Sequence, residues 1–172
     1  MGGEVTAQVF GLISFALGMS TFYQKDDKKL KILMLLLNLN HLVHFILMGS
    51  MVSAASALLS TFRTGMAIYT RSLWVATLFV IISVAVGVTL AQDAWQLWPI
   101  AGTVIGTISI FVLKDIPLRL GFLLGATCWL INNISIGSIG GSLLEASVIM
   151  MNVLTIARLY RDKRSADIVS QG

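Results

Sequence analysis

Residues 72–91 read SLWVATLFVIISVAVGVTLA, an apolar run without a charged side chain. Arg71 precedes the run and Asp93 follows it, so charge marks both ends. A helix needs about 20 apolar residues to cross a bilayer core of roughly 30 Å. The stretch therefore predicts a membrane-spanning helix.

Outward from this run, the chain divides into six more apolar stretches, separated by charged or glycine-containing breaks. They cover about 5–23, 30–48, 51–69, 97–113, 118–136 and a last stretch that ends near Tyr160. Pro117 is read as the stop after the fifth. With 56% hydrophobic and 12% charged residues and a mean hydropathy of +0.87, the chain is unlike a soluble globular domain. Seven spans would use nearly all 172 residues and leave no room for a soluble domain, and we expect no cleavable signal peptide.

The basic residues predict the orientation of these spans. Eleven of the twelve Lys and Arg residues fall on one side of the predicted layout: Lys25, Lys28, Lys29, Lys31, Arg71, Lys114, Arg119, Arg158, Arg161, Lys163 and Arg164. The other side has only Glu4 and Asp93, and Arg63 lies inside the third span. Basic residues accumulate on the cytoplasmic face, so we expect the N-terminus outside and the C-terminus in the cytoplasm. The net charge of +4 is then explained by membrane orientation. We therefore expect the lipid bilayer as a partner and no binding of nucleic acid.

Similar loops recur at a fixed spacing and suggest an internal repeat. Lys25-Asp26 and Lys114-Asp115 are 89 residues apart, and the turns Gly49-Ser50 and Gly137-Ser138 are 88 apart. We therefore predict an all-α membrane protein with seven transmembrane helices arranged 3+1+3. Its parts would be a first triple-helix unit at 1–70, a linker helix at 71–93, a second unit at 94–161 in the same orientation, and a cytoplasmic tail at 162–172.

This layout resembles the SWEET and PQ-loop superfamily, and more closely the YgjV family of bacterial inner-membrane proteins. The blocks that carry the resemblance are Phe62-Arg63-Thr64, Thr70-Arg71-Ser72-Leu73-Trp74-Val75, Pro99-Ile100-Ala101-Gly102-Thr103 and Gly137-Ser138-Ile139-Gly140-Gly141-Ser142-Leu143-Leu144-Glu145, with Asn152 and Arg158. The superfamily includes sugar uniporters, amino-acid exporters and a retrieval receptor, so the resemblance implies binding or movement of small solutes. The chain departs from the PQ-loop branch because neither unit has its Pro-Gln pair, and the first three spans contain no proline.

Polar residues within the spans are the candidate substrate-binding residues. Ionisable groups at a helix centre cost about 2.5 to 3.5 kcal/mol each on insertion scales, so they usually face the interior of a bundle. The candidates are Glu145, His41, His44, Asn132, Asn133, Arg63, Asn152 and Trp129. Counting about 1.5 Å per residue places Arg63 and Asn152 in an inner layer and the two His, Asn132, Asn133 and Glu145 in an outer layer. The 89-residue offset matches His44 with Asn133, Ser56 with Glu145, and Arg63 with Asn152.

Structural roles compete with this interpretation. Asn38 and Asn152 could simply bond a neighbouring helix. Arg63 could extend to the cytoplasmic headgroups, and His44 could be solvated near the outer interface. Glu145 could pair with His41.

Motifs for catalysis are missing from the sequence. It has no HExxH, GxSxG or phosphate loop and no pair of cysteines, so we expect neither an enzyme nor a bound metal or cofactor. The leading hypothesis is a small-solute transporter or permease, a multi-pass protein of the bacterial inner membrane with its polar site between the two units. The alternative is a non-transporting membrane protein that binds a small ligand or a protein partner. Self-association into a homo-oligomer is left open.

Overall fold

The computed structural model describes residues 2–21, 27–70 and 72–170. This part of the chain is all-α, with seven α-helices, one short 3-10 helix and no strand. The elements are α1 (Gly2–Thr21), α2 (Asp27–Leu47), α3 (Met51–Tyr69), α4 (Leu73–Leu90), η1 (Ala94–Leu97), α5 (Trp98–Val112), α6 (Asp115–Ser135) and α7 (Ile139–Ser170). The predicted all-α fold is confirmed. Lys25 and Arg71, which helped to define the basic side, lie outside the described residues.

Three stretches of the described chain are long and apolar enough to cross a membrane by themselves: Leu73–Leu90, Ala94–Val112 and Ile139–Arg161. A shorter apolar segment is Ile32–Leu47. The third helix shows why the predicted seven spans are not all strongly apolar. α3 buries Arg63 together with several serine and threonine side chains, which lower its mean hydropathy but face the bundle interior. The span count of seven stays a prediction.

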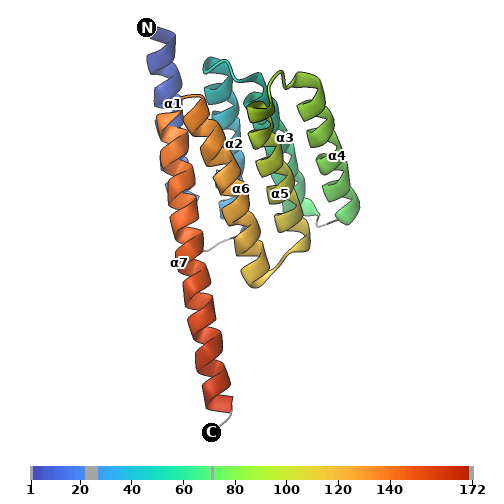
Figure 1. The fold of residues 1–172 in the computed structure, drawn as a ribbon, viewed down its shortest axis with the longest axis vertical. Helices are drawn as coiled ribbons and strands as arrows, with labels where there is room; N and C mark the ends of the chain where they lie inside the picture. Colours follow the sequence, from blue (N-terminus) through green and yellow to red (C-terminus); the bar gives the residue numbers. More distant parts are fainter. Residues whose placement is uncertain (1, 22–26, 71, 171–172) are drawn as a thin grey trace.

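The helices form a closed bundle in which neighbours along the chain are also neighbours in space (Figure 1). α2 packs between α1 and α3, and α6 packs between α5 and α7. Two further contacts join these groups, because α7 packs on α1 and α3 packs on α5. α4 lies at the edge against α5 and α3, and it buries only Ala76, Ser83 and Gly87. In Figure 1, α1 begins at one end of the bundle and α7 ends far beyond the opposite end.

The turns after α2 and α6 have the same geometry. Gly49 has φ +74° and Gly137 has φ +72°, the left-handed conformation that glycine adopts at helix ends. The next residue then donates to a carbonyl five residues back, from Ser50 N to Phe45 O (3.0 Å) and from Ser138 N to Asn133 O (2.8 Å). Both turns are therefore the same helix-ending motif, in which backbone bonds satisfy the last carbonyls of the helix.

The spacing of these turns differs by one residue from the offset used to match residues in the sequence. The equivalent atoms of the two turns are 88 residues apart, not 89. An offset of 88 pairs His44 with Asn132 instead of Asn133, and it pairs Arg63 with Met151 instead of Asn152.

Two helix boundaries also differ from the prediction. The fifth stretch was expected to end near Leu113, and α5 ends at Val112. However, α6 begins at Asp115 instead of near Leu118, so Pro117 lies in the first turn of α6 and not between the helices. A proline costs little there, because the first backbone N–H groups of a helix have no partner within the helix. The expected end of the last helix near Tyr160 is also too early. α7 continues to Ser170, so most of the predicted tail is helical.

Replacement by alanine should change the free energy of unfolding in opposite directions at a glycine with positive φ and at a glycine inside a helix. A Cβ on Gly137 meets no atom within 4 Å, so Gly137→Ala tests the positive φ alone. We expect it to lower the free energy of unfolding by about 1 kcal/mol or more. Gly65, inside α3, has only Leu35 Cδ1 at 3.9 Å, so Gly65→Ala should raise it by about 0.5–1 kcal/mol. Thermal unfolding of the detergent-solubilised variants measures both changes. Equal effects of the two substitutions would contradict the prediction.

Candidate functional site

Hydrogen bonds of His44 join the helices at the end of the bundle where α2 ends and α7 begins, which is the predicted outer end. This fully buried α2 side chain has Nδ1 2.7 Å from the Ala7 carbonyl oxygen of α1 and Nε2 2.7 Å from Ser138 Oγ. A carbonyl oxygen only accepts, so Nδ1 donates, and Nε2 of the neutral ring accepts from the Ser138 hydroxyl. Ser138 Oγ in turn accepts from Gly141 N in the first turn of α7 (3.1 Å). His44 is therefore not solvated, and its ring connects α1, α2 and the start of α7.

A second hydrogen bond joins the start of α3 to α6. Ser53 Oγ of α3 donates to Asn132 Oδ1 of α6 (2.9 Å), and Ser50 and Ser53 share a hydrogen bond of 2.6 Å. Asn132 and Ser53 are fully buried. The offset of 88 that relates the turns also relates His44 to Asn132 and Ser138 to Ser50. One side chain of α2 thus contacts the start of α7, and its counterpart on α6 contacts the start of α3.

Asn133 lies beside this layer with its amide unused. The side chain is fully buried, and neither Nδ2 nor Oδ1 has a hydrogen-bond partner among the described residues. A Cβ on Gly141 would lie 2.5 Å from Asn133 Oδ1 and 2.6 Å from Ser138 Oγ. The amide therefore sits directly over the first turn of α7, where only a glycine leaves room for it.

Within the same layer, Phe45 is the centre of an aromatic cluster. It is fully buried, its ring centroid lies 5.2 Å from that of His41 and 5.1 Å from that of His44, and it stacks on Trp129 at 5.6 Å. Sequence reasoning identified Trp129 and the histidines but missed Phe45. Its spacing is a usable signal, because positions 41 and 45 share one helix face. Phenylalanine is common in membrane-spanning helices and carries no polar group, so the sequence alone did not distinguish Phe45 from its apolar neighbours.

Arg63 points across the bundle to α5. Its Nη1 donates to Thr103 O (3.2 Å) and to Thr107 Oγ1 (3.1 Å), and the residue is 8% exposed. The alternative in which Arg63 extends to the cytoplasmic headgroups is therefore wrong. Thr103 and Thr107 are partners that the sequence analysis missed; they lie four residues apart and flank Gly106 on the same helix.

Asn152 and Glu145 make fewer contacts than expected. Asn152 is buried and donates to Val148 O of its own helix (2.9 Å), and no described hydrogen bond joins it to Arg63. Glu145 is partly buried, and no described residue forms a hydrogen bond or an ion pair with it. The proposed pairing of Glu145 with His41 is thus not formed. Asn38 does bond a neighbouring helix, through Ser60 O (3.3 Å) and Thr64 Oγ1 (3.1 Å) of α3.

Several polar side-chain atoms in the interior have no hydrogen-bond partner. Among the described residues, the buried side-chain atoms without a hydrogen-bond partner are His41 Nε2, Arg63 Nε, Asn132 Nδ2, Asn133 Nδ2, Asn133 Oδ1 and Asn152 Oδ1. Most buried polar groups in folded proteins are hydrogen-bonded. All of these atoms belong to residues that the sequence singled out, and they come from α2, α3, α6 and α7.

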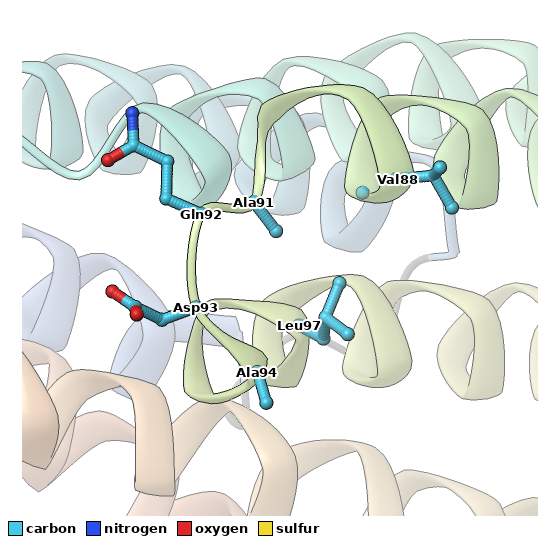
Figure 2. A pocket seen from close by; sticks show the side chains of 7 residues that line it. Val88, Ala91, Gln92, Asp93, Ala94 and Leu97 are labelled. Atoms are coloured by element: carbon cyan, nitrogen blue, oxygen red, sulfur yellow. The ribbon is translucent and has the colours of Figure 1, made fainter.

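A separate cavity of about 250 Å³ lies at the turn between α4 and η1 (Figure 2). Gly87, Val88, Ala91, Gln92, Asp93, Ala94 and Leu97 line it, and none of the predicted site residues does. In Figure 2 the side chains of Gln92 and Asp93 extend to the opposite side from those of Val88 and Leu97. Among the described residues, no three His, Cys, Asp or Glu side chains gather in a way that could hold a metal ion.

Comparison with known proteins identifies the family of this helical bundle. Residues 5–163 match a family model described as a bacterial inner membrane protein, Imp-YgjV. The chain is also 35% identical over 162 residues to the inner membrane protein YgjV of Escherichia coli strain K12, covering 94% of this chain and 88% of the relative. The chain belongs to the YgjV family of bacterial inner membrane proteins. The resemblance to the YgjV family seen in the sequence is thereby confirmed. No solved structure matches the chain, so the details of a YgjV-family interior come from the contacts described above.

A double-mutant cycle tests the outer connection of this YgjV-family protein. We expect His44→Ala and Ser138→Ala each to destabilise the fold, and their effects to fall short of additivity by about 1 kcal/mol, the typical worth of one buried hydrogen bond. The control cycle combines His44→Ala with Ser147→Ala, because Ser147 bonds only the Leu143 carbonyl of its own helix. The free energy of unfolding of each variant is measured on the detergent-solubilised protein. Additive effects of His44→Ala and Ser138→Ala would rule out the bond.

Proposed function

We propose that this inner membrane protein is a small-solute transporter or permease whose polar site lies between two triple-helix units. The observation that carries the proposal is the set of unpartnered polar atoms on His41, Arg63, Asn132, Asn133 and Asn152, all of them at most 8% exposed. Water is scarce in a bilayer core, so an unused polar group there costs several kcal/mol. A solute with complementary groups would remove that cost.

The contacts between helices support the 3+1+3 arrangement behind this proposal. If α1, α2 and α3 are equivalent to α5, α6 and α7, the contact of α1 with α7 corresponds to that of α5 with α3. In both cases a residue near the end of α2 or α6 bonds a serine at the start of α7 or α3, as in His44 with Ser138 and Asn132 with Ser53, although an offset of 88 pairs Ser138 with Ser50 and not with Ser53. α4 has no counterpart and buries little of its surface, as expected for a linker. The unused polar atoms come from α2 and α3 on one side and from α6 and α7 on the other, so a solute between them would contact both units.

The predicted orientation has support from aromatic residues at both ends of the bundle. Tyr69, Trp74 and Tyr160 are exposed near the ends of α3, α4 and α7, on the predicted cytoplasmic side. Trp95 and Trp98 are exposed at the opposite turn between α4 and α5. Aromatic side chains of this kind gather at the two interfaces of a membrane. A multi-pass protein with its N-terminus outside and its C-terminus in the cytoplasm fits both belts.

The outer layer also offers a means of opening. The bonds of His44 and Asn132 to the starts of α7 and α3 are hydrogen bonds between neutral groups, each worth only about 1 kcal/mol net because water can replace either partner. Separation of the units at this end would expose these groups to water at small cost. The stack of Phe45 on Trp129 lies beside His44 and would be a further barrier to a solute.

One feature favours a second candidate, a membrane protein that binds a small ligand or a partner without transporting it. The chain has only two prolines, and Pro99 and Pro117 both lie in the first turns of helices, where they introduce no kink. Hinges based on proline are therefore missing from the helix interiors. A binding protein needs the polar interior but no alternating access.

Asn133 provides the sharpest test of the transport proposal. Its amide has no partner in the fold, so Asn133→Ala should leave stability nearly unchanged while it removes hydrogen bonds to a solute. We expect kcat/KM for uptake to fall by roughly 3- to 10-fold, as for the loss of one neutral hydrogen bond. Uptake into proteoliposomes is measured for labelled sugars, amino acids and small carboxylic acids.

Asn40→Ala is the matched control for this experiment. The Asn40 amide donates to Phe10 O and to Ser14 Oγ, each at 2.7 Å, so its loss should destabilise the protein by about 1–3 kcal/mol with little direct effect on uptake. Transport that is unchanged in Asn133→Ala would remove this residue from the site. Binding without uptake of any solute would favour the second candidate.

A further inference from the structure

Two acceptors of α5 fix one end of the Arg63 guanidinium. Nη1 donates to Thr103 O and to Thr107 Oγ1, while Thr107 Oγ1 itself donates to Thr103 O at 2.7 Å. Gly106 lies directly beneath, because a Cβ on Gly106 would be 3.2 Å from Nη1. The guanidinium thus rests on the backbone of α5 with its position set by a small network of hydrogen bonds.

The opposite edge of the same guanidinium is unused. Nε is buried without a partner, and no described residue accepts a hydrogen bond from Nη2. The N–H groups on Nε and Nη2 are parallel and form a planar fork that matches the two oxygens of a carboxylate or a phosphate. The contacts to Thr103 and Thr107 therefore hold Arg63 so that its two-donor edge stays free.

No protein carboxylate balances the charge of Arg63 among the described residues. The acids whose side chains are described are Glu4, Asp93 and Glu145, and none forms an ion pair with Arg63. Glu145 is the only one of them inside a span, and counted along their helices from the outer ends it lies roughly 9 Å closer to the outside. A buried cation without a partner is costly, because desolvation removes its interaction with water. An anionic ligand would supply both the charge and the acceptors.

We propose that Arg63 is an anion-binding residue that receives a carboxylate or another oxyanion on its Nε and Nη2 atoms. The identification of that anion with the transported solute rests on the proposed function, whereas binding itself does not. The solute class would then be small organic acids or other compounds with a planar oxyanion. A lipid phosphate has the same acceptor chemistry, so the test must separate it from a soluble anion.

Binding is tested on the purified full-length protein with sodium acetate, inorganic phosphate and acetamide, each at matched ionic strength. The readouts are the shift in Tm and the Kd from calorimetric titration. We expect acetate or phosphate, but not acetamide, to raise the Tm of the wild type, since bound ligand stabilises the folded state. Arg63→Gln should weaken that binding roughly 10- to 100-fold, as expected for the loss of charge-assisted hydrogen bonds.

Two variants separate the charge and the shape of the fork from effects on folding. Arg63→Lys keeps the charge but loses the two parallel donors, so its affinity should fall between those of the wild type and Arg63→Gln. Arg158→Gln removes the same charge from an exposed position on α7 and should bind like the wild type. An equal response of Arg63→Gln and Arg158→Gln to the anions overturns the proposal, and so does a shift by acetamide as large as that by acetate.

The lipid source is tested in nanodiscs of phosphatidylglycerol and of phosphatidylcholine. A stabilisation by phosphatidylglycerol that needs Arg63, without a response to acetate or phosphate, overturns the assignment to a soluble anion. Uptake of a neutral solute that is unchanged in Arg63→Gln, together with absent anion binding, overturns this inference but leaves the transport proposal standing. Anion binding through Arg63 with no uptake of any solute would overturn the transport proposal but leave this inference standing.

Discussion

The hydrogen bonds of His44 and Asn132 join the two groups of helices at the outer end, and the polar interior depends on them. Both are hydrogen bonds between polar side chains, from near the end of one helix to the start of another. In hydrocarbon such groups must be satisfied within the protein. The bundle therefore closes around its polar residues instead of exposing them, and the apolar side chains of the helices remain for the outer surface.

Close helix approach is the second requirement of this interior, and glycine provides it. A Cβ on Gly140 would overlap the backbone of Gly11, so α7 and α1 meet almost backbone to backbone. At the α5–α6 contact, a Cβ on Gly102 would lie 2.6 Å from Trp129 Cδ1 and 3.1 Å from Gly125 O. Small residues at such crossings gain packing contacts that hydrophobic burial cannot supply in lipid. The position of the Trp129 ring over Phe45 follows from this close approach.

The apolar runs of the sequence predicted the helices to within a few residues, and the rarity of polar groups in lipid predicted which side chains would be buried. The hydrogen-bond partners of these buried side chains could not be predicted in the same way. The hydrogen bonds of Arg63 to Thr103 and Thr107, and of Asn132 to Ser53, depend on how the helices are aligned with one another. That alignment is set by packing and cannot be read from the sequence. Phe45 was missed because its role comes from its neighbours. The end of α7 was misplaced because a polar helix outside the membrane has no apolar pattern to reveal it.

The length of α7 has a mechanical consequence. Its 32 residues span about 48 Å, some 18 Å more than a bilayer core of roughly 30 Å. The helix is pinned near its first turn, where Gly140 meets Gly11 and Ser138 meets His44. A rigid rod held at one end is a lever, so a tilt of about 10° at that pivot displaces its far end by roughly 8 Å. A small rearrangement at that pivot would in this way be amplified into a larger displacement at the far end of α7.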